Sequence, residues 1–377
     1  MAQLANSKNW VFDVSALMVL ISEDEELKYR LSGRSKIEAL CAAPVAGLQT
    51  YLKSYEILLQ TTSYSYFSPY GCKTASLRNM TLDNAIKKAG LLEDGKCTYF
   101  QIPQSSSKSK SISSQWIWVT FTWLCMGELL VLCQLGPGTT WIGLTNCVVI
   151  TGWSAFLRII ERIMVRPASG NESLVTRPDR PDSVVILGRS HSAVIISGSR
   201  KDIKAWTANG LIYNQNSSRT LNSVWQAFTR VGTLFVLILA FSTNPNGSTM
   251  DQVIFILLNV LGQLNTLMGL WLNAKSCLNL LGKMPDSVEN VPSRTCIYAS
   301  LIRHFKDIKD NGWVDKVNLL PQTDVWSEWR DRVASDTKTD PKELYNSIND
   351  EYTRRPRKQM PIDSTKPSLT ESSSSDA

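Results

Sequence analysis

Two long runs of apolar residues lie between residues 116 and 160 and dominate the hydropathy pattern of the chain. Each run is roughly 20 residues long, which is the length an α-helix needs to cross the hydrocarbon core of a bilayer. A Gly136-Pro137-Gly138 turn separates the two runs, tryptophans mark their ends, and charged residues are nearly absent. The pattern therefore predicts a transmembrane helical hairpin at 116–160.

Two further apolar runs predict a second hairpin at 224–272. They cover 224–244 and 252–272, and a short polar linker joins them. Arg230 lies inside the first of these runs, so its long side chain is expected to reach back to the lipid headgroups. The sequence thus predicts a mainly α membrane protein built on a four-helix transmembrane bundle.

The positions of the basic residues predict the orientation of the bundle. The connections at 136–140 and 245–251 carry no Lys or Arg, whereas the segment 158–230 carries eleven. Since basic loops stay on the cytosolic side of a membrane, both termini and the long second loop are expected in the cytosol.

The polar parts of the chain predict a cytosolic α+β region, built from the N-terminal segment and the long second loop. Residues 36–59 are helix-like, a helix is expected to begin at Thr81 as its N-cap, and residues 97–103 alternate as a strand. Residues 10–22 lack the uninterrupted apolar core of a signal peptide, which favours a buried strand or helix, with a membrane-associated segment as the alternative.

The loop itself predicts two β-rich runs around Gly188-Arg-Ser-His191, followed by a short helix that Gly210 closes. A ββα unit of this size is too small to bury a core, so we expect it to pack on the N-terminal region, adding strands beside 97–102. The predicted segments are the cytosolic N-terminal region 1–104, a linker 105–115, the first hairpin 116–160, the loop 161–223, the second hairpin 224–272, amphipathic cytosolic helices 273–334 and a disordered tail 335–377.

Glu128, near the middle of the first run, is the first candidate for chemistry. An ionisable side chain in a span normally faces protein or a water-filled cavity. Glu128 is expected roughly 10 Å from the lumenal end of its helix, a depth similar to that of Asn259. Other polar residues that we expect on intramembrane faces are Asn146, Gln263 and Thr266. Two interpretations stay open: a polar cavity with Glu128 as acid or ligand anchor, and hydrogen-bonded packing between helices.

Arg189 and His191 form the second candidate, a turn that would bind phosphate; an ordinary hairpin turn is the alternative. The sequence contains only two His, and its 8 Cys show no CxxC spacing. We therefore expect no metal site and no cofactor. The net charge of +7 and the mean hydropathy of −0.10 are averages over very apolar and very polar blocks, and no nucleic-acid partner is predicted.

Four blocks of sequence resemble uncharacterised fungal multi-pass membrane proteins across about residues 60–275. They are SPYGC, TTWIGLTNCVVITGW, VVILGRSHSAVIISGSRKDIKAW and NPNGSTMDQVIFILLNVLGQLN. The chain is also similar in size and span count to the paxilline-synthesis-protein-A type of membrane protein from indole-diterpene clusters. This resemblance implies a protein of the endoplasmic reticulum that assists the biosynthesis of terpenoid mycotoxins, and it carries over no catalytic residue.

Two functions follow as hypotheses. The first is a non-enzymatic accessory or scaffold protein, whose partners are the lipid bilayer and other cytosolic or membrane proteins. The second is a membrane-embedded terpenoid cyclase or lipid-handling enzyme, in which a dry site keeps Glu128 protonated so that it acts as an acid. A transporter ranks third, because four helices without a detectable repeat are few for that task.

Overall fold

A computed structural model of the chain describes most residues between 23 and 354. The expectation for residues 10–22 lies outside the described residues. Described are 23–33, 37–53, 55, 58, 62, 64–103, 111–167, 180–208, 210–213, 219–285, 287, 290–308, 312–336 and 338–354.

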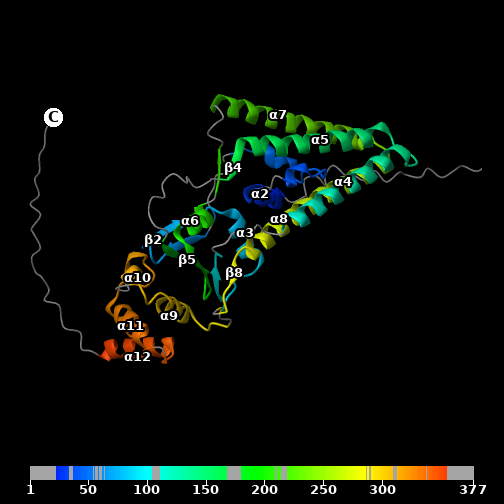
Figure 1. Ribbon diagram of the computed structural model, residues 1–377. Helices are drawn as coiled ribbons and strands as arrows, with labels where there is room; N and C mark the ends of the chain where they lie inside the picture. Colours follow the sequence, from blue (N-terminus) through cyan, green and yellow to red (C-terminus); the bar gives the residue numbers. More distant parts are fainter. Residues whose placement is uncertain are drawn as a thin grey trace, which may run out of the picture.

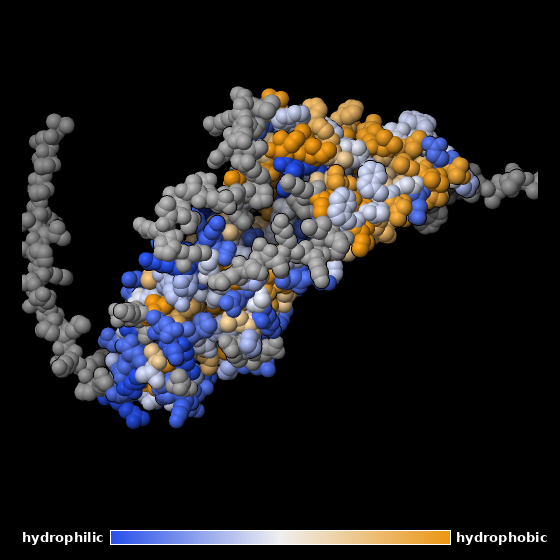
Figure 2. Space-filling view, in the orientation of Figure 1, coloured by the Kyte–Doolittle hydropathy of each residue, from blue (hydrophilic) through white to orange (hydrophobic). Residues whose placement is uncertain are grey.

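In the described part of the chain, four helices are long and apolar enough to cross a membrane, as judged by length and composition. They confirm long apolar helices at the positions predicted for the two hairpins, and each pair extends several residues beyond the predicted bounds. The helices are α4 (Ser111–Leu135), α5 (Trp141–Met164), α7 (Arg219–Thr243) and α8 (Thr249–Asn279). In Figure 2 the apolar side chains gather over these helices, and the polar ones gather over the rest of the molecule.

The four helices form two pairs that meet at one end and spread apart at the other. Figure 1 shows α5 beside α7 and α4 beside α8, with α2 between the two pairs. The described residues of the segment 23–58, here called the N-terminal insert, occupy the space where the pairs spread. The predicted bundle is therefore open at this end and filled by the N-terminal insert.

The N-terminal insert contains little regular structure. Its elements are the α-helix α2 (Glu23–Leu31) and two short 3₁₀ helices, η1 (Glu38–Leu40) and η2 (Leu48–Leu52). The helix expected over 36–59 is therefore wrong. The apolar residues of the N-terminal insert pack against several helices at once. Leu31, Ala43, Tyr51 and Leu58 lie in the same buried cluster as residues of all four long helices.

A six-stranded sheet lies at the end of the helices where the two pairs spread (Figure 1). The order of its strands is β2-β1-β5-β6-β3-β8, and among them only β3 and β6 run parallel. This arrangement confirms both the ββα unit and the expectation that its strands add beside 97–102. The strands are β1 (Ser65–Ser68), β2 (Lys73–Ser76), β3 (Cys97–Gln101), β5 (Pro181–Leu187), β6 (Ala193–Ser199) and β8 (Gly282–Lys283). Two further strands, β4 (Val165–Pro167) and β7 (Leu211–Tyr213), pair with each other.

Each face of the sheet buries an apolar core. One core joins the sheet to α3 (Met80–Lys88), α6 (Arg200–Ala208) and the last turns of α8, through Ala274 and Cys277. The other core contains Trp313 and Trp329. Its helices are α9 (Arg294–His304), α10 (Trp313–Lys316), α11 (Asp324–Ser335) and α12 (Pro341–Arg354). Because α8 belongs both to the long-helix group and to the sheet core, it joins the two parts of the molecule directly.

Two predicted boundaries need correction. The N-cap of α3 is Asn79 and not Thr81, since the Asn79 side chain accepts hydrogen bonds from the backbone N–H groups of Thr81 and Leu82. The tail predicted to be disordered from 335 includes helix α12. Asp340 accepts hydrogen bonds from the first backbone N–H groups of α12, and Pro341 follows as the first residue of that helix.

Candidate functional site

The segment 40–46 of the N-terminal insert begins at the last residue of η1 and then continues as irregular backbone between α4, α5 and α8. Cys41, Ala43 and Val45 are each no more than 4% exposed. Gly262 of α8 provides the room, because a Cβ at this position would lie 3.0 Å from the carbonyl oxygen of Pro44. An irregular backbone in such a buried place requires partners for its polar groups.

Side chains of α4 and α5 supply these partners. On the α4 side, Trp123 Nε1 donates to Leu40 O at 2.9 Å, and Ala42 N donates to Thr122 Oγ1 at 3.3 Å. These two bonds satisfy one acceptor and one donor of the segment.

On the α5 side, Val45 N donates to Ser154 Oγ at 2.9 Å. The buried guanidinium of Arg158 donates to Cys41 O at 2.6 Å and also to Ala43 O. Arg158, predicted only as one of the basic residues at a helix end, therefore holds the segment in place.

A buried ion pair lies next to this segment. Arg30 of α2 is 1% exposed, and its Nε donates to Glu161 Oε2 of α5 at 2.8 Å. Its Nη1 donates to Thr50 O at 2.8 Å, and the guanidinium lies 3.7 Å from the ring centroid of Tyr51. Burial lowers the pKa of Arg30, but the charge of Glu161, followed by Tyr51, Tyr55 and Glu26, outweighs it and raises this pKa above its ordinary value. Arg30 thus stays charged and paired.

The predicted polar face of α8 meets the acidic side chains of α2. Gln263 Nε2 donates to Glu25 Oε2, and Thr266 Oγ1 donates to Glu26 Oε2 at 2.7 Å. One turn further on, Gly269 leaves the space that the Tyr29 ring fills. The small and polar residues of this face therefore receive the N-terminal insert rather than another long helix.

Asn259, although predicted on the same face, bonds within its own helix. Its Nδ2 donates to Phe255 O at 2.8 Å. Asn259 thus bonds to α8 itself, whereas Gln263 bonds to α2.

Glu128 lies on the outer surface of α4. It is exposed, as are Gly127 before it and Val131 one turn later, whereas Met126 and Leu129 are buried. The position of Glu128 inside the bundle, which both interpretations assumed, is wrong. The physical reason is the rotation of α4 about its axis, which is set by the apolar residues that pack inward.

Hydrogen-bonded packing between helices occurs elsewhere, as between Asn146 and Thr243. Asn146 belongs to a separate polar contact at the end where the hairpins turn. Its Oδ1 accepts a hydrogen bond from Thr243 Oγ1 of α7 at 3.1 Å. Nearby, the buried Asp251 accepts hydrogen bonds from Thr140 N at 3.0 Å, Thr140 Oγ1 at 2.6 Å and Ser248 N at 2.9 Å. These bonds tie the two hairpins together. The Ser248-x-x-Asp251 spacing is a capping-box signal that could have identified Asp251 from the sequence.

The turn with Arg189 and His191 is a hairpin turn that docks on the 90–96 loop. The carbonyl of His191 accepts a hydrogen bond from Gly95 N at 3.1 Å, and its Nδ1 lies 4.0 Å from a carboxylate oxygen of Asp94. Arg189 is exposed. A carboxylate lies beside His191, so the contacts of this turn are those of an ordinary hairpin turn rather than those of a phosphate-binding site.

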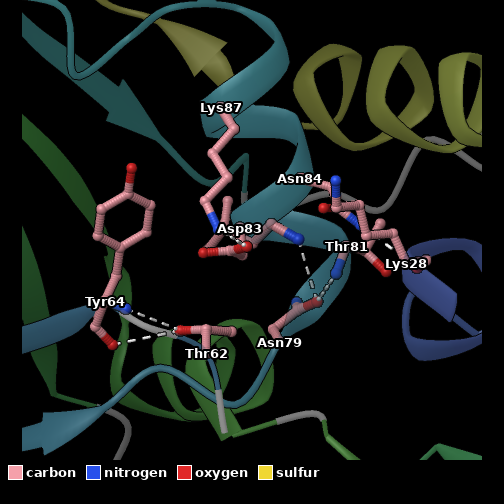
Figure 3. A network of polar contacts seen from close by, with 9 residues as sticks. Lys28, Thr62, Tyr64, Asn79, Thr81, Asp83, Asn84 and Lys87 are labelled. Carbon is pink, nitrogen blue, oxygen red and sulfur yellow. Dashed lines mark hydrogen bonds and ion pairs between the residues drawn. The ribbon is translucent and has the colours of Figure 1, made fainter. Parts of the chain in front are cut away.

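The N-terminus of α3 connects the sheet to the N-terminal insert (Figure 3). Thr81 Oγ1 donates to Ser32 O at 2.6 Å, just after the end of α2, and Asn79 Nδ2 donates to Trp206 O at 2.9 Å. In the same view Lys87 Nζ lies 2.7 Å from the buried Asp83 carboxylate. The N-terminal insert is therefore bonded to α3, which packs on the sheet, as well as to the long helices.

No group of three or more His, Cys, Asp or Glu side chains suited to a metal ion occurs among the described residues. Comparison of the chain with family models, curated proteins and solved structures finds no match. The function must therefore be argued from the geometry of this chain.

Proposed function

We propose that the chain is a multi-pass membrane scaffold, which spans the bilayer with α4, α5, α7 and α8 and holds the sheet region at the cytosolic surface. The single observation that carries the proposal is the buried position of residues 41–46 between the helix pairs. A membrane-embedded enzyme or carrier needs open volume among its spans, and here protein fills the space at the wide end.

The depth of this filling supports the proposal. Thr122 lies about 12 Å inside the apolar stretch of α4 that begins at Ser114, and Ser154 lies about 15 Å from the end of α5. A non-helical backbone at such depth is stable only where protein surrounds it and pairs its polar groups. The bonds with Arg158, Ser154, Thr122 and Trp123 supply such partners.

The orientation of the scaffold is part of the proposal. All strands of the six-stranded sheet lie at one end of the four helices, so that end lies on one side of the bilayer. The basic residues concentrate in the loop that reaches this end, whereas 136–140 and 245–251 at the opposite end carry none. This distribution of basic residues supports a cytosolic position for the sheet region.

The acid-catalyst alternative loses its structural basis, because Glu128 faces outward from α4. The comparisons add nothing in favour of fungal terpenoid biosynthesis or of the endoplasmic reticulum, so neither is part of the proposal. What the protein binds is expected to lie at the surface of the sheet and of helices α9, α11 and α12.

Protease protection in sealed membrane vesicles tests the proposal. The full chain should resist alkaline extraction. Protease added outside vesicles with an exposed cytosolic face should remove α11 and α12, while tags inserted after Gly138 and after Gly247 stay intact. If protease removed the tags and left α11 intact, the orientation would be the opposite of the proposed one. If alkaline buffer released the chain, the proposal that it spans a membrane would be wrong.

Glu128→Gln separates a scaffold from an acid catalyst. The variant should rescue a deletion strain as fully as the wild type, at equal protein level. If the variant is present at a normal level and fails to rescue, the acid has a function and the scaffold proposal is insufficient.

A further inference from the structure

The outward face of α4 carries Glu128 in the middle of an apolar stripe. Leu124 is 63% exposed and Val131 is 55% exposed, and Glu128 is exposed between them. If the four helices span the bilayer, as proposed above, this carboxyl group faces lipid. A carboxyl group at the centre of a span costs about 2.5–3.5 kcal/mol on insertion scales, so a stable protein is expected to cover it.

The exposed positions on this face follow a heptad spacing. Steps of four and three residues alternate along the whole apolar stretch. This spacing is the one that forms the seam of a left-handed coiled coil. The seam consists of Ile117, Phe121, Leu124, Glu128, Val131 and Leu135. A single polar residue at one seam position sets register and oligomeric state in such coils, and Glu128 occupies that position.

Membrane insertion limits the orientations in which a second copy of α4 can pack against this seam. All copies of the chain cross the bilayer in the same direction, so a two-fold axis that relates two copies must lie along the membrane normal. A residue next to that axis then meets its own counterpart at the same depth. Glu128 of one copy would face Glu128 of the other, with apolar seam residues above and below.

We propose that the protein forms a parallel homodimer through the α4 seam, with the two Glu128 carboxyl groups hydrogen-bonded to each other. The occupant of the seam is a second copy of this chain. A hydrogen bond between two carboxyl groups requires a proton on one of them, and this proton lies between oxygens of the two side chains. Gly127, whose Cβ position is open, allows the two helices to approach closely.

The test uses the full chain reconstituted in lipid nanodiscs or vesicles, with two differently labelled populations and energy transfer as the readout. Wild-type copies should associate. Glu128→Leu should raise the dissociation constant about three- to thirty-fold, which corresponds to one interhelical polar contact. Glu128→Gln should dimerise like the wild type, because an amide pair also hydrogen-bonds across the axis.

A matched pair of double variants identifies the face. The change Leu124→Ala with Val131→Ala should weaken the dimer, whereas Leu234→Ala with Ile238→Ala should not, although these α7 residues are also exposed. A monomeric wild type in lipid, or a Glu128→Leu variant that associates like the wild type, overturns the dimer and leaves the scaffold proposal standing. Extraction of the chain by alkaline buffer would overturn both.

Discussion

Arg30 and Glu161 stand 131 residues apart in the chain, yet their side chains meet at 2.8 Å in a site that is almost closed to water. The pair joins α2 to the end of α5, and the same guanidinium holds the carbonyl of Thr50. The N-terminal insert is therefore attached to α5 by the charged guanidinium of Arg30, which bonds to Glu161 and to Thr50 at the same time. The expected consequences of this attachment are open to measurement.

Arg30→Met should lower the free energy of unfolding by about 3–5 kcal/mol, because it leaves the Glu161 carboxylate buried without its partner. Thermal unfolding of the full chain in detergent, followed by tryptophan fluorescence, measures the change. The double variant Arg30→Met with Glu161→Met should recover much of the loss. Lys53→Met removes a more exposed ion pair with Glu23 and should cost less than about 1 kcal/mol. Equal effects of the Arg30 and Lys53 variants would contradict the structure.

Arg158→Met should open the segment 40–46, since the carbonyls of Cys41 and Ala43 lose their donor. Each unpaired buried carbonyl costs about 1–3 kcal/mol. The Cys41 thiol, 2% exposed in the intact protein, should then react faster with a membrane-permeant maleimide, with the label located by mass spectrometry. Ile159→Ala, on the exposed side of α5, serves as the control and should leave the rate unchanged.

Gly269→Ala should displace α2, because a Cβ at this position would overlap the ring of Tyr29. Overpacking of this kind costs roughly 1–3 kcal/mol. The matched control is Gly152→Ala on α5, where a Cβ meets nothing within 4 Å. Helical Gly→Ala at an open site is expected to stabilise by about 0.5–1 kcal/mol. The two variants should therefore shift the unfolding temperature in opposite directions.

Ile348→Ala should destabilise the pairing of α11 with α12 by about 2–5 kcal/mol, because Ile348 is fully buried. Limited proteolysis of the full chain should then cleave within 337–354 much faster. Ser347→Ala changes an exposed neighbour in the same helix and should have no effect. A chain that is cleaved equally fast in all three forms would contradict the helix α12.

Lowering the pH should loosen the connection between α11 and α12 only when the pH falls through the pKa of Asp336 in the folded protein. Hydrogen bonds from Thr339 Oγ1 and from the backbone N–H groups of Lys338 and Thr339 lower the pKa of Asp336. A carboxylate of this kind stabilises the folded protein at pH values above its pKa in the unfolded chain. This stabilisation is lost as the pH falls through the lower pKa that the group has in the folded protein. Thr339→Val should raise the pKa of Asp336 toward its ordinary value, as measured by carbon NMR of the carboxyl group.

The membrane-length helices, the ββα unit and its place beside β3 were predictable from the sequence, since length, periodicity and turn residues are local signals. The Asp340-Pro341 start of α12 carried a similar local signal and was missed. The path of the segment 40–46 had no such signal. Its backbone bonds to side chains of helices that lie 80 and 109 residues later, and no local pattern records those partners.

The sequence by itself determined which stretches become long apolar helices, because the required length and lack of charge can be read residue by residue. Only the tertiary structure decided what those helices face. Rotation about a helix axis moved Glu128 to the outside and turned Gln263 and Thr266 toward Glu25 and Glu26, 238 and 240 residues away. That rotation follows from the packing of all the elements together, because burying the apolar residues of every helix at once leaves few orientations for each of them.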